Sequence, residues 1–390
     1  MMRKLLIFVL FVVQTAVLAA ADIDDIVCRL ENAGFADIRA AQTEEYVVVS
    51  LSCDSYKLPV EGLSRARQIL EDALEENPVK IKVICTDRNV PQLTMTFDPS
   101  SGRWSTTRRL DESWDVVKVE RRTASSIGRT NILFYPQISI KNLIINQVYQ
   151  TLWQISPALE VSLWPGMKLS YQLKYPLFND GFGDAESKVH PGMMALSQSF
   201  RDPWHLNVFG KVTAGVFSSN RYGLALEAWY YFPGERLSVD TQLAMLANCY
   251  FDGFIFKFGR HPYFRWNVAL NYYMPSLDTQ FTLRLQKFLL GDVGLKYEMI
   301  RHFDRCSVGL YAEKAKEAPL NVGFRFQVSL PPYNMKRRGY APLVSTSTSM
   351  GMSYNSNNEL YYYKEFRTEA SDNILWKNAY NPFFIDRHAK

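Results

Sequence analysis

The sequence predicts a mainly β protein: an antiparallel transmembrane β-barrel of about 12–16 strands, preceded by a small α+β module. Three observations carry this prediction. Apolar and polar residues alternate repeatedly from about residue 130 onward. Aromatic residues make up 14% of the chain and gather near the predicted turns. The first residues have the pattern of an export signal.

The N-terminus predicts the compartment. Residues 1–21 begin with the basic Met1-Met2-Arg3-Lys4, continue with the apolar Leu5 to Val13, and end in small residues before Asp22. This is the pattern of a cleaved signal peptide. The apolar run is shorter than the ~20 residues that a membrane-spanning helix needs. We therefore expect an exported chain that crosses a membrane with strands.

Residues 22–98 are predicted to form a compact periplasmic α+β module. The spacing of Ile23, Ile26 and Leu30 is helical, and strands are expected over 36–39, 46–51, 79–84 and 92–97, with a second helix over 60–75. An oxidising compartment favours a disulfide among the cysteines at 28, 53 and 85, whose pairing stays open (Cys28, Cys53, Cys85). Residues 99–128 are predicted to be a linker.

Residues 129–332 are predicted to be the barrel core. In 320–330 the even-numbered residues are uniformly apolar, and the odd-numbered set is small or polar except for its charged Arg325. Such alternation over segments close to the ~9–11 residues of a membrane-crossing strand favours a barrel, although a soluble β-sandwich also alternates. Residues 333–390 are expected either to supply a closing strand, near 359–366 or 374–384, or, if the barrel closes near Leu330, to form a plug or tail.

Aromatic clusters near the predicted turns decide between barrel and sandwich. They indicate the aromatic girdle of a membrane barrel. The clusters are Tyr230-Tyr231-Phe232, Tyr250-Phe251, Tyr263-Phe264, Tyr272-Tyr273 and Tyr361-Tyr362-Tyr363.

The parity of the strands also predicts which side chains face the lumen. If the apolar parity faces lipid, a set of charged residues points inward, where such groups most often pair and brace the wall. A polar path or a sugar-binding surface is the alternative, with Trp229 and Tyr231 as stacking platforms. The predicted lumen-facing residues are Lys211, Glu227, Asp240, Lys257, Arg284, Lys296, Glu298 and Arg325.

No catalytic or metal-binding pattern stands out. The five histidines form no H-E-x-x-H motif, and neither a G-x-S-x-G elbow nor a phosphate-binding Gly-rich loop occurs. His302 and Asp304 are predicted to lie in one solvated turn. We expect no catalytic residue, metal or cofactor, and the dispersed net charge of +5 gives no indication of nucleic-acid binding.

The middle of the chain resembles the YjbH-type exopolysaccharide biosynthesis proteins. The resemblance lies in Phe209–Phe217 and Arg221–Tyr231, in Gln147-Val148-Tyr149 through Leu163-Trp164-Pro165-Gly166-Met167, and in Leu290–Gly294 with Phe303 and Val308-Gly309. The N-terminal module adds Asn32–Phe35 and Gly62–Ala66. The chain departs from the family in its shorter length, and in having no lipid-anchor cysteine of the kind that some relatives carry.

This resemblance implies an outer-membrane barrel that assists export or assembly of an extracellular or capsular polysaccharide, without catalysis. Its implied partners are outer-membrane lipid, the polysaccharide and periplasmic export-system proteins. Two alternatives remain from the residues themselves: a structural or interaction barrel that docks a periplasmic partner through residues 22–98, and, more distantly, an outer-membrane hydrolase. Fold transfers between relatives more safely than substrate does.

Overall fold

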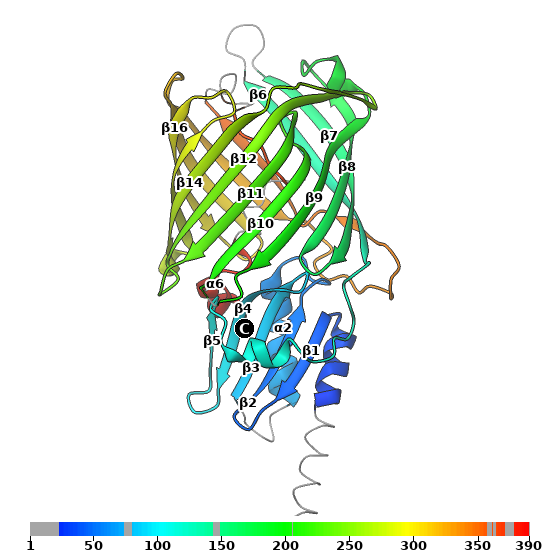
Figure 1. Cartoon of the computed structure of the whole chain (residues 1–390), viewed down its shortest axis with the longest axis vertical. Coiled ribbons are helices and arrows are strands. Elements are labelled where there is room, and N and C mark those ends of the chain that lie inside the picture. Colours follow the sequence, from blue (N-terminus) through cyan, green and yellow to red (C-terminus); the bar gives the residue numbers. More distant parts are fainter. Residues whose placement is uncertain are drawn as a thin grey trace, which may run out of the picture.

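The computed structural model describes residues 23–73, 80–142, 149–204, 206–356, 361, 364–370 and 378–389. It shows a β-barrel standing on a smaller α+β module (Figure 1). The predicted signal peptide lies outside the described residues. No helix among the described residues is long and apolar enough to cross a membrane.

The module is a five-stranded sheet with strand order β1-β2-β3-β4-β5. β2 and β3 run parallel, because helix α2 carries the chain between them, and the other pairs are antiparallel. Helices over 23–33 and in α2 supply residues to the apolar core. The elements are β1 (Ala36–Gln42), β2 (Tyr46–Ser52), α2 (Pro59–Ala73), β3 (Lys80–Asp87), β4 (Val90–Asp98), β5 (Arg103–Thr107) and α3 (Glu112–Val117).

The prediction of a linker over 99–128 is wrong in its first part. Residues 103–107 form β5 and extend the sheet by pairing with β4. Residues 112–117 form α3, whose Val117 packs in a second small core with Val48 and Ile84 on the other face of the sheet. The alternating, half-polar pattern of this stretch suits an edge strand, so the residues predicted to connect the two parts mostly belong to the module.

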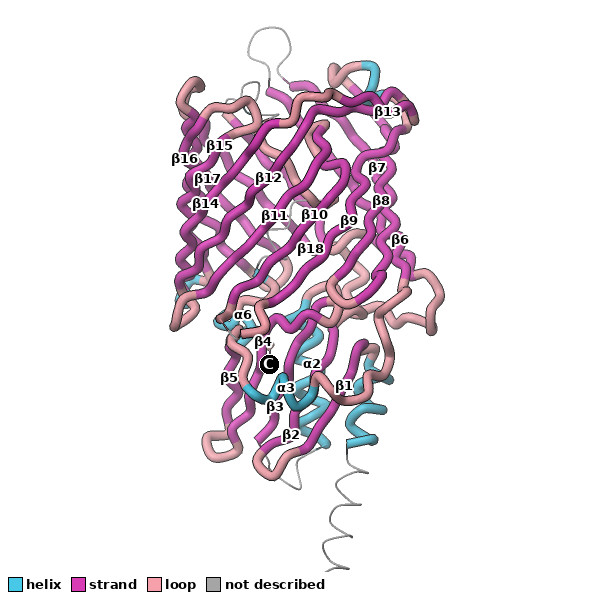
Figure 2. Tube along the Cα trace, in the orientation of Figure 1, coloured by secondary structure: helices cyan, strands magenta, loops and turns pink. Residues whose placement is uncertain are grey.

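The barrel wall is one sheet whose order begins at β19, runs through β6 to β18 and ends at β20. Neighbouring strands follow one another in hairpin order and lie tilted across the wall (Figure 2). The strands are β6 (Thr130–Asn142), β7 (Tyr149–Trp164), β8 (Met167–Asn179), β9 (His190–Arg201), β10 (Val208–Phe217), β11 (Arg221–Tyr231), β12 (Leu237–Asp252), β13 (Ile255–Phe258), β14 (Tyr263–Met274), β15 (Thr279–Lys287), β16 (Val293–His302), β17 (Cys306–Ala315), β18 (Asn321–Ser329), β19 (Leu343–Thr346) and β20 (Ser349–Asn355).

A single interrupted segment closes the wall. Its first half, β19, pairs in parallel with β6, and its second half, β20, pairs antiparallel with β18. Only Ser347 and Thr348 separate the two halves, and Ser347 N–H donates to Phe134 O of β6 at 2.9 Å. Closing strands do lie within residues 333–390, but at 343–355, ahead of the predicted 359–366 and 374–384. The expected range of about 12–16 strands contains the fourteen strands of the sheet path.

The two faces of the wall differ as the alternation predicts. In β18 the even-numbered Val322, Phe324 and Phe326 are exposed on the outer face, whereas Gln327 is only 1% exposed. Exposed apolar side chains cover the outer face of the other wall strands in the same way. The outer face is therefore suited to lipid and the inner face to a polar interior.

Candidate functional site: the closed lumen

The lumen wall carries the charged residues that the parity of the strands predicts. Lys211, Glu227, Asp240, Arg284, Lys296, Glu298 and Arg325 all lie on inward-facing positions of the wall. Lys257 does not, and its prediction is wrong. It lies in β13, which pairs with β12 outside the main path of the wall, and its ammonium approaches Asp252 at 3.5 Å in an exposed hairpin. The parity argument failed there because the strand extends beyond the barrel.

The inward charges form ion pairs between strands that are neighbours or two strands apart in the wall. Lys211 Nζ lies 3.0 Å from Glu227 Oε2, directly across β10 and β11. Arg325 Nη2 lies 2.9 Å from Glu298 Oε1, two strands away. Arg284 pairs with Asp240 at 3.5 Å. This pairing braces the wall, which is the first of the two interpretations given for these residues above.

A segment of the chain itself, residues 364–370, occupies the lumen. Glu365 Oε1 accepts hydrogen bonds from Gln286 Nε2 at 2.9 Å and from Lys296 Nζ at 3.1 Å. Glu369 Oε1 accepts from Lys211 Nζ at 3.0 Å, and Thr368 donates to Glu227 at 2.8 Å. We call residues 364–370 the lumen segment.

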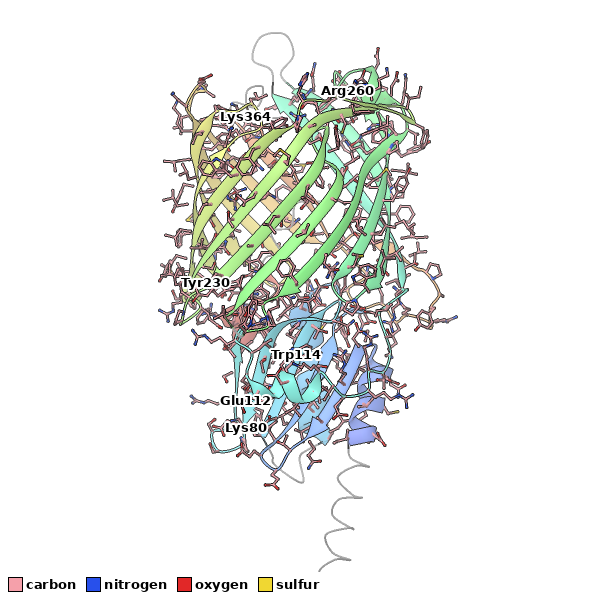
Figure 3. All side chains as sticks on the ribbon, in the orientation of Figure 1. Lys80, Glu112, Trp114, Tyr230, Arg260 and Lys364 are labelled. Carbon is pink, nitrogen blue, oxygen red and sulfur yellow. The ribbon has the colours of Figure 1, made fainter. Side chains whose placement is uncertain are left out.

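The lumen segment is fixed at the rim that lies away from the module, the far rim. Lys364 Nζ pairs with Asp292 at 2.6 Å, both side chains being only 6% exposed, and Lys364 lies near this rim in Figure 3. Backbone bonds join Leu289 N to Lys364 O and Ser218 N to Arg367 O. Tyr361 is buried there against Phe288, so its assignment to the aromatic girdle is wrong; Tyr362 and Tyr363 lie outside the described residues.

At the other end, the chain returns to the module as helix α6 (Pro382–His388), which lies between barrel and module (Figure 1). Tyr380, Phe384 and Ile385 are buried in the module's apolar core. The end of α6 also binds the barrel: Arg387 donates to Asp278 at 2.7 Å, and His388 bridges to Asp304 at 2.6 Å. The C-terminal part of the chain thus joins far rim, lumen and module.

The module covers the near mouth of the barrel through polar contacts with its turns. Glu235 of the β11–β12 turn accepts from the Thr107 hydroxyl and the Arg108 N–H, both at 2.8 Å. Lys57 Nζ donates to Thr346 Oγ1 and to Ser347 O at the closing segment. Burial lowers the pKa of Lys57 to about 8. The module is therefore seated on the wall.

The predicted stacking residues are already covered by protein. Trp229 stacks on Phe209 with ring centroids 5.9 Å apart, and Tyr231 meets the same ring edge-on. The guanidinium of Arg108, from the module, lies 4.2 Å from the centre of the Tyr231 ring. Both residues are half-buried, and in this closed form their rings contribute to the joint between module and barrel.

The predicted turn at His302 and Asp304 is different in the structure. His302 ends β16, is 4% exposed, and its Nδ1 lies 2.8 Å from Ser307 Oγ. Asp304 pairs with His388 instead. His302 is therefore a buried strand histidine rather than a solvated one. Among the described residues, no group of three or more His, Cys, Asp or Glu side chains is arranged to hold a metal, and Cys28, Cys53 and Cys85 are free thiols.

Sequence reasoning missed the residues that close the lumen, namely Lys364, Glu365 and Glu369. They lie in a stretch without alternation, which gives no strand signal. The available indication was that stretch itself: two carboxylates four residues apart, after the last alternating segment, in a chain with predicted lumen-facing lysines.

Comparison with known proteins adds little to this description. No protein-family model matches the sequence, and no curated protein matches it. Among solved structures, a mutant of the Rh. blastica porin aligns with a TM-score of 0.28 and 8% identity, covering 52% of this chain and 90% of that one. OmpT, an outer membrane protein of Vibrio cholerae, aligns with a TM-score of 0.26 and 8% identity, over 58% and 96% of the two chains. The assignment as a membrane-type β-barrel therefore rests on the chain's own strand pairing and apolar outer face.

Proposed function

We propose that this chain is a non-catalytic outer-membrane barrel that assists export or assembly of an extracellular polysaccharide, with its module in the periplasm. The observation that supports the proposal most is the lumen segment. It closes a polar lumen through ion pairs rather than through an apolar core, and it continues into a helix inside the module. Such a closure can be displaced and replaced by polar cargo, because water and other ions can satisfy the same groups.

The orientation follows from the module. A folded α+β module with a predicted export signal ahead of it belongs on the periplasmic side, where export-system proteins can reach it. A partner that pulls α6 away from the module would also loosen the lumen segment. The resemblance to the YjbH-type proteins suggests that the cargo is a polysaccharide, and the lumen segment suggests how its passage is controlled.

Deletion of the gene in its natural host tests the proposal. We expect the amount of polysaccharide on the cell surface to fall severalfold, with recovery on expression of the unaltered chain. Surface polysaccharide at the wild-type level, in a strain shown by immunoblot to have lost the protein, would contradict the export role.

A structural or interaction barrel is the second candidate, and the same closure favours it: the lumen is filled and the near mouth is covered. Planar-bilayer recordings separate the two. Gated export predicts rare conducting bursts that become frequent when the lumen segment is weakened, whereas a purely structural barrel stays silent in both forms.

A further inference from the structure

The lumen wall has more positive than negative charge when the lumen segment is left out. Excluding the first and last residue of each strand, the described inward positions carry eight basic and five acidic side chains, an excess of three positive charges. The basic residues are Lys141, Lys168, Lys174, Lys211, Arg265, Arg284, Lys296 and Arg325, and the acidic ones are Glu160, Glu227, Asp240, Glu298 and Glu313.

The lumen segment places its two carboxylates against this positive wall. Lys296 Nζ lies 3.1 Å from both oxygens of Glu365, although Lys296 also has Glu313 at 3.6 Å. Glu369 lies on Lys211, which also has Glu227. Each lysine thus binds one carboxylate of the wall and one of the segment. The second carboxylate occupies a position that another anion can take.

Arg265 shows most directly why another anion must take the place of Glu365 when the lumen segment leaves. Arg265 is 3% exposed, and it donates to three neutral acceptors among the described residues: Lys287 O, Gln242 Oε1 and Gln286 Oε1. Glu365 is the acidic group that acts on it electrostatically. A buried guanidinium without a counter-ion is strongly unfavourable. Displacing Glu365 therefore requires a replacement anion, and a carboxylate is the group that already fits there.

The two glutamates remain accessible to water. The side chain of Glu365 is 39% exposed and that of Glu369 is 29% exposed. A wet, charge-paired contact of this kind exchanges partners more readily than a dry one, because solvent stabilises the separated groups. An entering anion can therefore compete with the segment without unfolding the wall.

The geometry points to a binding site for a linear carboxylated polysaccharide in the lumen, at the two positions that Glu365 and Glu369 hold in the closed form. The glutamates act as resident competitors that keep the site filled until the acidic polymer displaces them. This inference rests on the proposed function and narrows its cargo to an acidic polymer. A neutral polysaccharide that displaced the segment would leave Arg265 without a counter-ion, and Lys211 and Lys296 each with one carboxylate partner instead of two.

Binding to the full-length protein in detergent tests the site. The probes are an oligogalacturonate and, as a neutral control, a maltooligosaccharide of the same length, measured by isothermal titration calorimetry. The variants are Glu365→Gln, Glu369→Gln and the double variant. Glu317→Gln, on an exposed turn of the far rim, is the matched control.

We expect the double variant to bind the oligogalacturonate on the order of tenfold tighter than the unaltered chain, since each tenfold step corresponds to ~1.4 kcal/mol. Each single variant should show part of the gain, and Glu317→Gln should show none. Adding Lys296→Gln should remove most of the gain, and rising salt should weaken binding. Heat-modifiable migration on gels verifies that each variant is folded.

Three results would overturn the site: equal affinity for the acidic and neutral oligomers, no gain in any of the Glu→Gln variants, or the full gain retained with Lys296→Gln. Failure of the binding site and failure of the export role can be told apart. A host polymer that is exported by this protein but proves neutral removes the inference and leaves the export role. Unchanged surface polysaccharide in the deletion strain removes the export role, whatever the calorimetry shows.

Discussion

At the scale of single residues, Asp111 shows how one side chain can serve two purposes in a stretch that was predicted to be a linker. Its Oδ1 caps α3 by accepting from Ser113 N–H at 3.0 Å, and its Oδ2 pairs with Lys82 of β3. Burial alone would raise the pKa of Asp111, but the hydrogen bonds and charge of Lys82 and the contact with Ser113 outweigh it, and the pKa is lowered.

Asp111→Asn should therefore destabilise the module in a pH-dependent way. Asparagine keeps the cap but leaves Lys82, itself 8% exposed, without its counter-ion, a loss of about 1–2 kcal/mol at pH 7. Because the folded pKa is lowered, the stabilisation by Asp111 is present above the unfolded value near 4 and is lost as the pH falls through the folded value. Urea unfolding followed by the fluorescence of Trp114 should show the two proteins converging in acid. A constant difference from pH 7 to pH 3 would contradict this account.

At the scale of elements, the wall depends on close backbone contacts that only glycine allows. Gly215 of β10 and Gly223 of β11 face each other in register, both with φ of +150°. A Cβ on Gly223 would lie 2.0 Å from Met245 O of β12, a distance far shorter than any allowed van der Waals contact. The strand pattern predicts that these strands pair, but not that two of their residues must be glycine.

Gly223→Ala should lower the fraction of folded barrel markedly, because the clash is with backbone and no rotamer relieves it. The matched control is Gly259→Ala. Gly259 has no positive φ, and a Cβ there would lie 3.5 Å from its nearest neighbour, Asn248 O. Heat-modifiable migration after refolding into detergent measures the folded fraction. Equal folding of the two variants would show that β11 and β12 separate without cost.

The orientation of β18 is the most direct test of the membrane face. Cysteines placed at Val322, Phe324 and Phe326, labelled with a fluorophore, should be quenched by brominated lipid, whereas those at Gly323, Arg325 and Gln327 should not, because successive side chains point to opposite faces of a strand. Equal quenching of the two sets would contradict a lipid-facing outer surface.

At the scale of the whole molecule, the sequence predicts the wall, but it indicates neither where the closing strands lie nor which residues enter the lumen. Alternation is a local signal, so the strands from β6 to β18 follow from it. The parallel pairing of β19 with β6 depends on the odd number of wall strands, counting β19 and β20 as one, and no short window contains that number. The contacts of Glu365 and Glu369 join residues 69, 79 and 158 positions apart, and no periodicity marks them. For the same reason the module, predicted to fold alone over 22–98, shares its core with α6.

Two truncations separate wall from plug. A chain that ends after Asn334 lacks β19 and β20 and leaves the edges of β6 and β18 unpaired, so it should give no heat-modifiable barrel. A chain that ends after Ser356 keeps the closing segment and loses the lumen segment, so it should insert and conduct ions. Recordings in planar bilayers measure both. A conducting barrel from the shorter chain would show that the closing segment is dispensable.

The burial of α6 in the module has a consequence for biogenesis. Tyr380, Phe384 and Ile385 leave the ribosome long after residues 23–124, and they reach the module only when the chain has passed through the ring of strands. The module, which is synthesised first, thus stays incomplete until the wall has closed and the C-terminal segment has reached it. Completion of that core reports that assembly has succeeded, and a chain that has been threaded wrongly keeps an open apolar surface for chaperones and proteases to recognise.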